Sequence, residues 1–177
     1  RGFVVRRLYR QRAMETMLVA LTKELEGRRT AREPCLVAMA TLLPGATDAL
    51  VSMHLPTWLP LLVHTLGMDD APVRLTCART LQRIVSRDHA AALLEHLPLL
   101  VPRLLEAAAT PQAPRLRVAA LQALQALTDA VPAAHLDAYR RAVVQALGRP
   151  RRGVDDAVRA VRTAAVDCRA AWYATQE

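Results

Sequence analysis

A block that opens with His-Leu-Pro occurs twice in this chain, and the spacing of its copies limits the possible folds most strongly. The first block begins at His54 and the second at His96, 42 residues later, and His135-Leu136 repeats the opening 39 residues further on. The stretches after these blocks also align, at Arg74, Arg117 and Arg162. A period of about 40–47 residues with two helices per period is typical of HEAT and armadillo arrays. The spacing therefore predicts an α-solenoid.

The composition favours helices for the packing of such an array. The 177 residues are 53% hydrophobic but only 3% aromatic. Leu and Ala are strong helix formers, whereas aromatic and β-branched residues are enriched in strands. We therefore expect an all-α fold rather than a β-sandwich.

Prolines and short polar turns predict where the helices of each pair begin. Pro56 and Pro98 fit the first turn of a helix, where a missing N–H group costs nothing. Pro60 and Pro102 follow one turn later and are expected to bend or restart the helix. Turns rich in Gly, Asp and Pro then precede the second helix of each pair.

These signals predict a HEAT-repeat α-solenoid of about four antiparallel helix pairs, folded as one domain over residues 1–177. Residues 1–13 are expected to end a truncated repeat, and the pairs to occupy roughly residues 14–43, 54–88, 96–131 and 135–173. A single pair cannot bury its own apolar face, so the pairs are expected to fold as one unit. Because the chain begins with Arg1 rather than Met, we expect it to be the C-terminal fragment of a longer solenoid.

The second helix of each predicted pair carries a polar row beside its apolar stripe. In HEAT arrays the second helices line the concave face, so these rows are the candidate protein-interaction residues. Arg is favoured at interfaces because its planar guanidinium makes several directed bonds. A merely solvated face remains the alternative. The candidates are Arg79, Arg83, Gln122, Gln125, Arg159 and Arg169.

The thiols and imidazoles do not indicate a metal or cofactor. Cys35, Cys77 and Cys168 are widely separated and form no CxxC motif, so we expect core residues and a reducing compartment. Cys35 and Cys77 are one repeat apart, at positions that should be equivalent and buried. The five His residues show no metal-ligand spacing and are expected to be structural, with His54, His96 and His135 marking helix starts.

Two further patterns predict structural contacts. Asp69 or Asp70 before Arg74, and Asp156 before Arg162, resemble the Asp and Arg ladder that links adjacent HEAT repeats. Direct contact with a partner remains the alternative for these charges. Trp58 and Trp172 are expected in the core or at an end cap, although Trp172 could instead be an interface anchor.

The net charge of +8 allows nucleic-acid binding but does not require it. All but one of the 24 basic residues are Arg, which can also reflect a GC-rich genome, and most are spread along the chain. We therefore expect no direct nucleic-acid binding. No apolar stretch reaches the ~20 residues of a membrane span, and no signal peptide is visible.

An ordered set of short motifs runs through most of the chain. Its members are Val5-Arg6, Tyr9 to Arg12, Leu97 to Ala107, Val118 to Gln122, Ala126 to Thr128, Tyr139, Val144, Ala146-Leu147, Pro150, Asp155-Asp156, Val161-Arg162, Ala165-Val166, Arg169 and Trp172. The set resembles one family of HEAT proteins, the large scaffold of the cytosolic iron–sulfur assembly targeting complex, although the connection Pro150-Arg151-Arg152-Gly153 departs from it.

The resemblance implies an adaptor without cofactor that acts in cytoplasm and nucleus. Such a scaffold binds the small cluster-transfer subunit and, indirectly, its propeller subunit. Together they deliver [4Fe–4S] clusters to apo-proteins, which include DNA repair and replication enzymes.

Three alternatives stay open. One is another HEAT adaptor, such as a transport receptor or phosphatase scaffold, and another is direct nucleic-acid binding through the Arg rows. The third is an enzyme of the helical alkylpurine DNA glycosylase type. That site needs an Asp flanked by aromatic residues, and Asp129 and Asp137 have none nearby except Tyr139. We therefore expect no enzyme activity.

Overall fold

The part of the chain that the structure describes folds into helices and contains no strand. The structure is a computed structural model that describes residues 7–27, 32–85 and 87–175. Its α-helices are α1 (Arg7–Gly27), α2 (Arg32–Leu42), α3 (Asp48–Thr65), α4 (Ala71–Ile84), α5 (Ala90–Ala108), α6 (Pro114–Ala130), α7 (Ala133–Leu147) and α8 (Arg159–Ala174). Three single-turn 3-10 helices are η1 (Leu43–Gly45), η2 (Arg87–His89) and η3 (Gly153–Asp155). The predicted all-α fold is confirmed.

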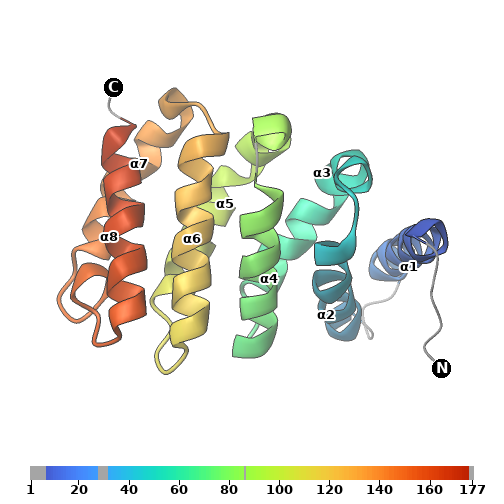
Figure 1. The fold of residues 1–177 in the computed structure, drawn as a ribbon, viewed down its shortest axis with the longest axis horizontal. Helices are drawn as coiled ribbons and strands as arrows, with labels where there is room; N and C mark the ends of the chain where they lie inside the picture. Colours follow the sequence, from blue (N-terminus) through green and yellow to red (C-terminus); the bar gives the residue numbers. More distant parts are fainter. Residues whose placement is uncertain (1–6, 28–31, 86, 176–177) are drawn as a thin grey trace.

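The helices form four successive pairs in two layers (Figure 1). The second helices α2, α4, α6 and α8 stand in a row, with the first helices α3, α5 and α7 behind them and α1 at the N-terminal end. α6 packs on α4 on one side and on α8 on the other, and each second helix also contacts the first helix of its own pair. This stacking of neighbours is the predicted solenoid.

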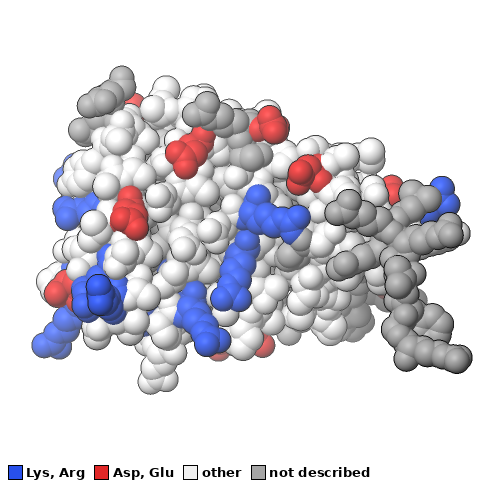
Figure 2. Space-filling view, in the orientation of Figure 1, with Lys and Arg blue, Asp and Glu red and all other residues white. Residues whose placement is uncertain are grey.

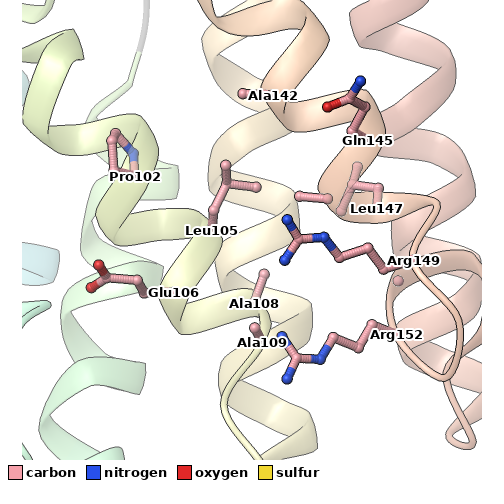
Figure 3. A pocket seen from close by; sticks show the side chains of 12 residues that line it. Pro102, Leu105, Glu106, Ala108, Ala109, Ala142, Gln145, Leu147, Arg149 and Arg152 are labelled. Carbon is pink, nitrogen blue, oxygen red and sulfur yellow. The ribbon is translucent and has the colours of Figure 1, made fainter.

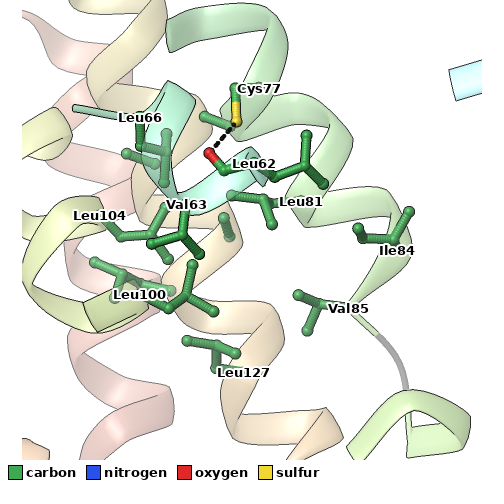
Figure 4. Packing of buried hydrophobic residues seen from close by; sticks show 14 of the residues in the cluster. Leu62, Val63, Leu66, Cys77, Leu81, Ile84, Val85, Leu100, Leu104 and Leu127 are labelled. Atoms are coloured by element: carbon green, nitrogen blue, oxygen red, sulfur yellow. Dashed lines mark hydrogen bonds between the residues drawn. The ribbon is translucent and has the colours of Figure 1, made fainter. Parts of the chain in front are cut away.

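Leu-rich stripes from successive pairs meet in one continuous core (Figure 4). Leu62 of α3, Leu81 of α4, Leu100 of α5 and Leu127 of α6 are all fully buried and belong to the same cluster. α6 buries eight residues and has a neighbouring second helix on each side, α4 and α8. Removing any of these Leu side chains would leave a cavity that neighbouring helices fill only in part.

Both tryptophans lie in the core, as predicted. Trp58 is 1% exposed and Trp172 is fully buried. The indole N–H of Trp172 in α8 donates to the carbonyl oxygen of Leu124 in α6, at 3.0 Å. Burying the indole without such a partner would be costly. This hydrogen bond therefore fixes the last pair against the third.

The helix starts at the His-Leu-Pro blocks were predicted wrongly. α3 and α5 each begin six residues before these blocks, so Pro56 and Pro98 lie inside their helices rather than in the first turn. Each helix also continues past a second proline, Pro60 or Pro102, without a restart. All four rings are exposed, so a carbonyl group that loses its N–H partner, such as that of Ser52, can bond water instead.

The N-terminal boundary differs as well. α1 runs without interruption from Arg7 to Gly27, so residues 7–13 belong to the first helix of the first pair. They do not end a truncated repeat as expected, because residues 7–26 contain no Pro or Gly that would stop a helix. The expectation for residues 1–6 lies outside the described residues.

A buried ion pair joins the third and fourth pairs. Arg117 of α6 contacts Asp156, which precedes α8, at 3.1 Å, and their side chains are 12% and 7% exposed. The Asp156 carboxylate also accepts a hydrogen bond from the Val158 amide, at 2.8 Å. Asp156 therefore links adjacent repeats, as the ladder pattern predicted.

Two other members of the predicted ladder, Arg162 and Asp70, have local roles. Arg162 donates to the carbonyl oxygens of Asp156 and Ala157, at 2.8 and 3.0 Å. Asp70 caps α4 by accepting a hydrogen bond from the Val73 amide, at 3.0 Å. Such a cap satisfies one of the free N–H groups at the start of a helix.

Two of the three cysteines are core residues, as predicted. The Cys77 thiol donates to the carbonyl oxygen of Leu62 at 3.0 Å (Figure 4). Burial raises the pKa of Cys77 far above its usual range and raises the pKa of Cys168 to about 12. Cys35 is only half-buried, so its predicted equivalence to Cys77 is wrong. It lies in the first turn of α2.

We predict that Asp156→Ala lowers the free energy of unfolding by about 3–5 kcal/mol, because Arg117 then stays buried without its counter-ion. Asp137→Ala is the matched control, since Asp137 pairs with Arg140 but is 60% exposed. It should cost no more than about 1 kcal/mol. Urea unfolding followed by circular dichroism measures both. Equal losses would contradict a special role for the buried pair.

We also predict that iodoacetamide modifies Cys35 well before Cys77 and Cys168 in the folded protein at about pH 8, because burial and a raised pKa keep the latter two as thiols. Mass spectrometry of timed samples measures the order. In guanidinium chloride the three thiols should react at similar rates. Modification of Cys77 as fast as Cys35 in the folded state would show that the core opens readily.

Candidate protein-interaction surface

An open groove runs between α6 and α8 on the face formed by the second helices. Its volume is about 610 Å³. Three of the six predicted interaction residues, Gln122, Gln125 and Arg159, lie together along it. The whole lining is Val118, Gln122, Gln125, Arg159, Ala160, Thr163, Ala164 and Asp167. We call this the α6–α8 groove.

Helical periodicity on each wall brings these side chains together. On α6, Gln122 and Gln125 are three residues apart and share one face, while Leu121 and Leu124 turn into the core. On α8 the groove residues recur every four positions, from Arg159 onward. The two faces meet because α6 and α8 pack side by side.

Sequence reasoning missed two polar groups of the groove, Thr163 and Asp167. They follow Arg159 at four and eight residues along α8, so they lie on the same face of that helix. The four-residue spacing is a signal that could have found them. Asp167 adds a carboxylate to a surface that was expected to offer only donors and amides.

The chemistry of the groove suits recognition of a polypeptide. Two amides, a guanidinium, a hydroxyl and a carboxylate offer both donors and acceptors. Val118 and two Ala residues supply small apolar patches between them. A mixed surface of this kind resembles the polar and apolar mosaic of transient protein interfaces.

Arg79 and Arg83 lie on α4 and do not line this groove. Arg79 is exposed. Arg83 reaches the carbonyl oxygen of Ala46 at 3.4 Å and borders a separate hollow of about 280 Å³, together with Asp48 and Asp88. The Arg83 guanidinium is therefore already engaged in a contact between the first and second pairs.

Arg169 also lies away from the groove. Its guanidinium lies over the Tyr173 ring, 5.4 Å from the ring centre, and donates to the Tyr173 hydroxyl at 3.3 Å. The guanidinium also approaches Gly148, at the end of α7. Six residues separate Arg169 from Thr163, which turns the two side chains to different sides of α8. As partner contacts, all six candidates remain predictions.

Charge on the second-helix face is divided into patches. Figure 2 shows separate clusters of Lys and Arg over this face with acidic side chains among them, rather than one continuous basic band. A continuous stripe is the usual electrostatic footprint of a nucleic-acid site. Among the described residues, the charges on this face do not form such a stripe.

Neither a metal-ligand cluster nor a membrane-spanning helix is found among the described residues. Within residues 7–27, 32–85 and 87–175, no three His, Cys, Asp or Glu side chains are grouped closely enough to hold a metal ion. Over the same residues, every helix is too short or too polar to cross a membrane.

Comparison with known proteins identifies the family. Residues 1–128 match the family model MMS19_C, described as RNAPII transcription regulator C-terminal. The chain is 31% identical over 170 residues to the bovine MMS19 nucleotide excision repair protein homolog, and the match covers 96% of this chain and 16% of the relative. The human protein of the same name is also 31% identical, with the same coverage.

Fungal relatives match over the same extent. The fission yeast DNA repair/transcription protein mms19 is 26% identical over 174 residues, which is 97% of this chain and 17% of that protein. Its budding yeast counterpart, also named as a DNA repair/transcription protein, is 27% identical over 173 residues. The chain thus spans about a sixth of the length of the relatives it matches. In agreement with the sequence resemblance, the chain belongs to the MMS19 family.

Proposed function

We propose that this chain is the C-terminal HEAT-repeat part of a scaffold of the cytosolic iron–sulfur assembly targeting complex. The observation that carries this proposal is the match of 96% of the chain to MMS19 proteins from animals. In this role the solenoid binds the small cluster-transfer subunit, and through it the propeller subunit. It thereby helps deliver [4Fe–4S] clusters to apo-proteins.

The names of the relatives support clients that act on DNA. The animal proteins are named for nucleotide excision repair and the fungal ones for DNA repair and transcription. A scaffold that supplies clusters to repair and replication enzymes would act in both cytoplasm and nucleus. Its contribution is to hold client and cluster-transfer subunit together, which raises their effective concentration.

The α6–α8 groove is the proposed contact for the cluster-transfer subunit. Arg159, Gln122 and Gln125 can each make more than one directed hydrogen bond, and they lie together on rigid helices. Rigid positioning reduces the side-chain and backbone ordering that binding costs.

We propose that the chain is not an enzyme, carries no cofactor of its own and does not bind nucleic acid directly. The donor and acceptor groups of the groove and the patchy charge of its face support adaptor binding. Another HEAT adaptor, of the transport-receptor or phosphatase-scaffold type, is the runner-up.

The test mixes the purified chain with the purified cluster-transfer subunit and follows the complex by gel filtration with light scattering. We predict co-elution, and a loss of affinity of about tenfold or more for Arg159→Glu, because the reversed charge faces the bound partner. Arg141→Glu is the matched control. Arg141 is exposed on α7, in the other layer, and gives the same change of charge.

Each other outcome has a definite meaning. Co-elution that is equally strong for both variants keeps the partner and excludes the α6–α8 groove. The absence of a complex at micromolar concentrations contradicts the proposed function and favours a different HEAT adaptor. Salt-sensitive binding to duplex DNA, with affinity in the micromolar range or better, would instead support a nucleic-acid role.

A further inference from the structure

A second concave site lies in the other layer of the solenoid, between α5 and α7. The hollow has a volume of about 440 Å³. Its floor is formed by small and apolar side chains, mainly Ala, together with Leu105, Leu147 and Pro102. Figure 3 shows Arg149 and Arg152 reaching from the α7–α8 connection across this hollow toward α5. We call it the α5–α7 hollow.

The two arginines have no counter-ion of their own among the described residues. Both are exposed, and neither guanidinium makes a hydrogen bond or ion pair within the described part of the chain. The acidic residue of the hollow is Glu106, on the opposite wall. Its carboxylate is already bonded to Arg103, at 2.9 Å. The hollow thus has an apolar floor and a rim with two positive charges that nothing within it neutralises.

The connection that carries these arginines has a defined conformation. Gly153 has a φ of +53°, and a Cβ atom there would lie 2.2 Å from the carbonyl oxygen of Leu147, so only glycine fits. Arg151 also has a positive φ, of 58°, and its amide donates to the Asp155 carboxylate at 2.8 Å. The Arg152 amide donates to the carbonyl oxygen of Arg149, at 3.2 Å.

A turn held in this way presents its side chains before any partner arrives. Binding then costs less ordering of the loop than it would for a flexible segment.

We propose that the α5–α7 hollow docks an acidic segment of a protein partner. Carboxylates of the segment pair with Arg149 and Arg152, and an apolar side chain next to them covers the Ala-rich floor. Arg and carboxylate groups form bidentate, charge-assisted hydrogen bonds, which give such a contact direction. This surface lies in the layer opposite the α6–α8 groove, so it goes beyond the proposed function and does not depend on it.

A polypeptide fits the hollow better than a nucleic acid does. A phosphate backbone needs a track of several cations, whereas this rim offers two. The floor of Ala, Leu and Pro offers no aromatic ring for a base to stack on, but it can cover the side chain of a Leu or Val.

The test measures binding of the whole chain to a short fluorescein-labelled peptide, in which two Leu residues are flanked by Glu residues, by fluorescence anisotropy. We expect saturable binding that weakens as salt is added. Arg149→Glu/Arg152→Glu should weaken it about tenfold, since two exposed ion pairs become repulsive. Ala142→Trp, at an exposed position of the floor, should weaken it by blocking the space for the Leu side chains.

The control variant is Arg12→Glu/Arg115→Glu, which changes two exposed arginines of α1 and α6 and shifts the net charge equally. It should leave peptide affinity within about twofold of the unchanged chain, because exposed charges far from a site are largely screened. Circular dichroism checks that each variant is folded. A peptide with Lys in place of Glu should not bind.

Three results would overturn the proposal. One is no saturable binding of the Glu–Leu peptide, and another is an equal loss of affinity in the control variant. The third is tighter binding of single-stranded oligothymidylate than of the peptide, with the same dependence on Arg149 and Arg152. None of these results bears on co-elution with the cluster-transfer subunit, so failure here and failure of the proposed function are distinguishable.

Discussion

The burial of α6 between α4 and α8 is the contact on which the rest of this structure depends. A single helix pair has apolar surface on two sides, and its two helices can cover only part of it for each other. The eight buried residues of α6 are therefore shielded from water by the preceding and the following pair together. Stability and shape consequently come from the stack, and every surface that could bind a partner is positioned by it.

Buried polar groups hold successive pairs in register. An apolar interface alone would tolerate sliding of one helix along another, whereas a buried donor must keep its acceptor. Among the described residues, four of these contacts span 36 to 48 residues, close to one repeat each. They join Trp58 to Thr22, Thr80 to Ala40, Arg117 to Asp156 and Trp172 to Leu124.

The two layers offer two kinds of surface to partners. The second helices present the α6–α8 groove, in which Gln122, Gln125 and Arg159 stand on regular helices with the spacing of the core residues beneath them. The first helices present the α5–α7 hollow, whose charge comes from a tight turn rather than from a helix. With the two proposed sites on opposite layers, the proposed scaffold would hold two polypeptides at once, which delivery of a cluster from one protein to another requires.

The sequence by itself determined the number of pairs, the all-α fold, the buried stripes and the burial of both tryptophans. These features follow from local periodicity, because the 3.6-residue spacing of apolar side chains and the length of the repeat can both be recognised in the order of residues. It also identified the two amides on the α6 wall of the groove, since Gln122 and Gln125 share a helix face whatever surrounds that helix.

Only the tertiary structure decided which faces of different helices meet. Packing set Arg159 beside α6 and turned Arg169 toward α7, and the connection between α7 and α8 placed Arg149 and Arg152 at the hollow beside α5. Packing and hydration likewise let α3 and α5 continue through exposed prolines. The free-energy cost of the backbone hydrogen bond that each proline removes depends on whether water can reach the carbonyl group left without a partner.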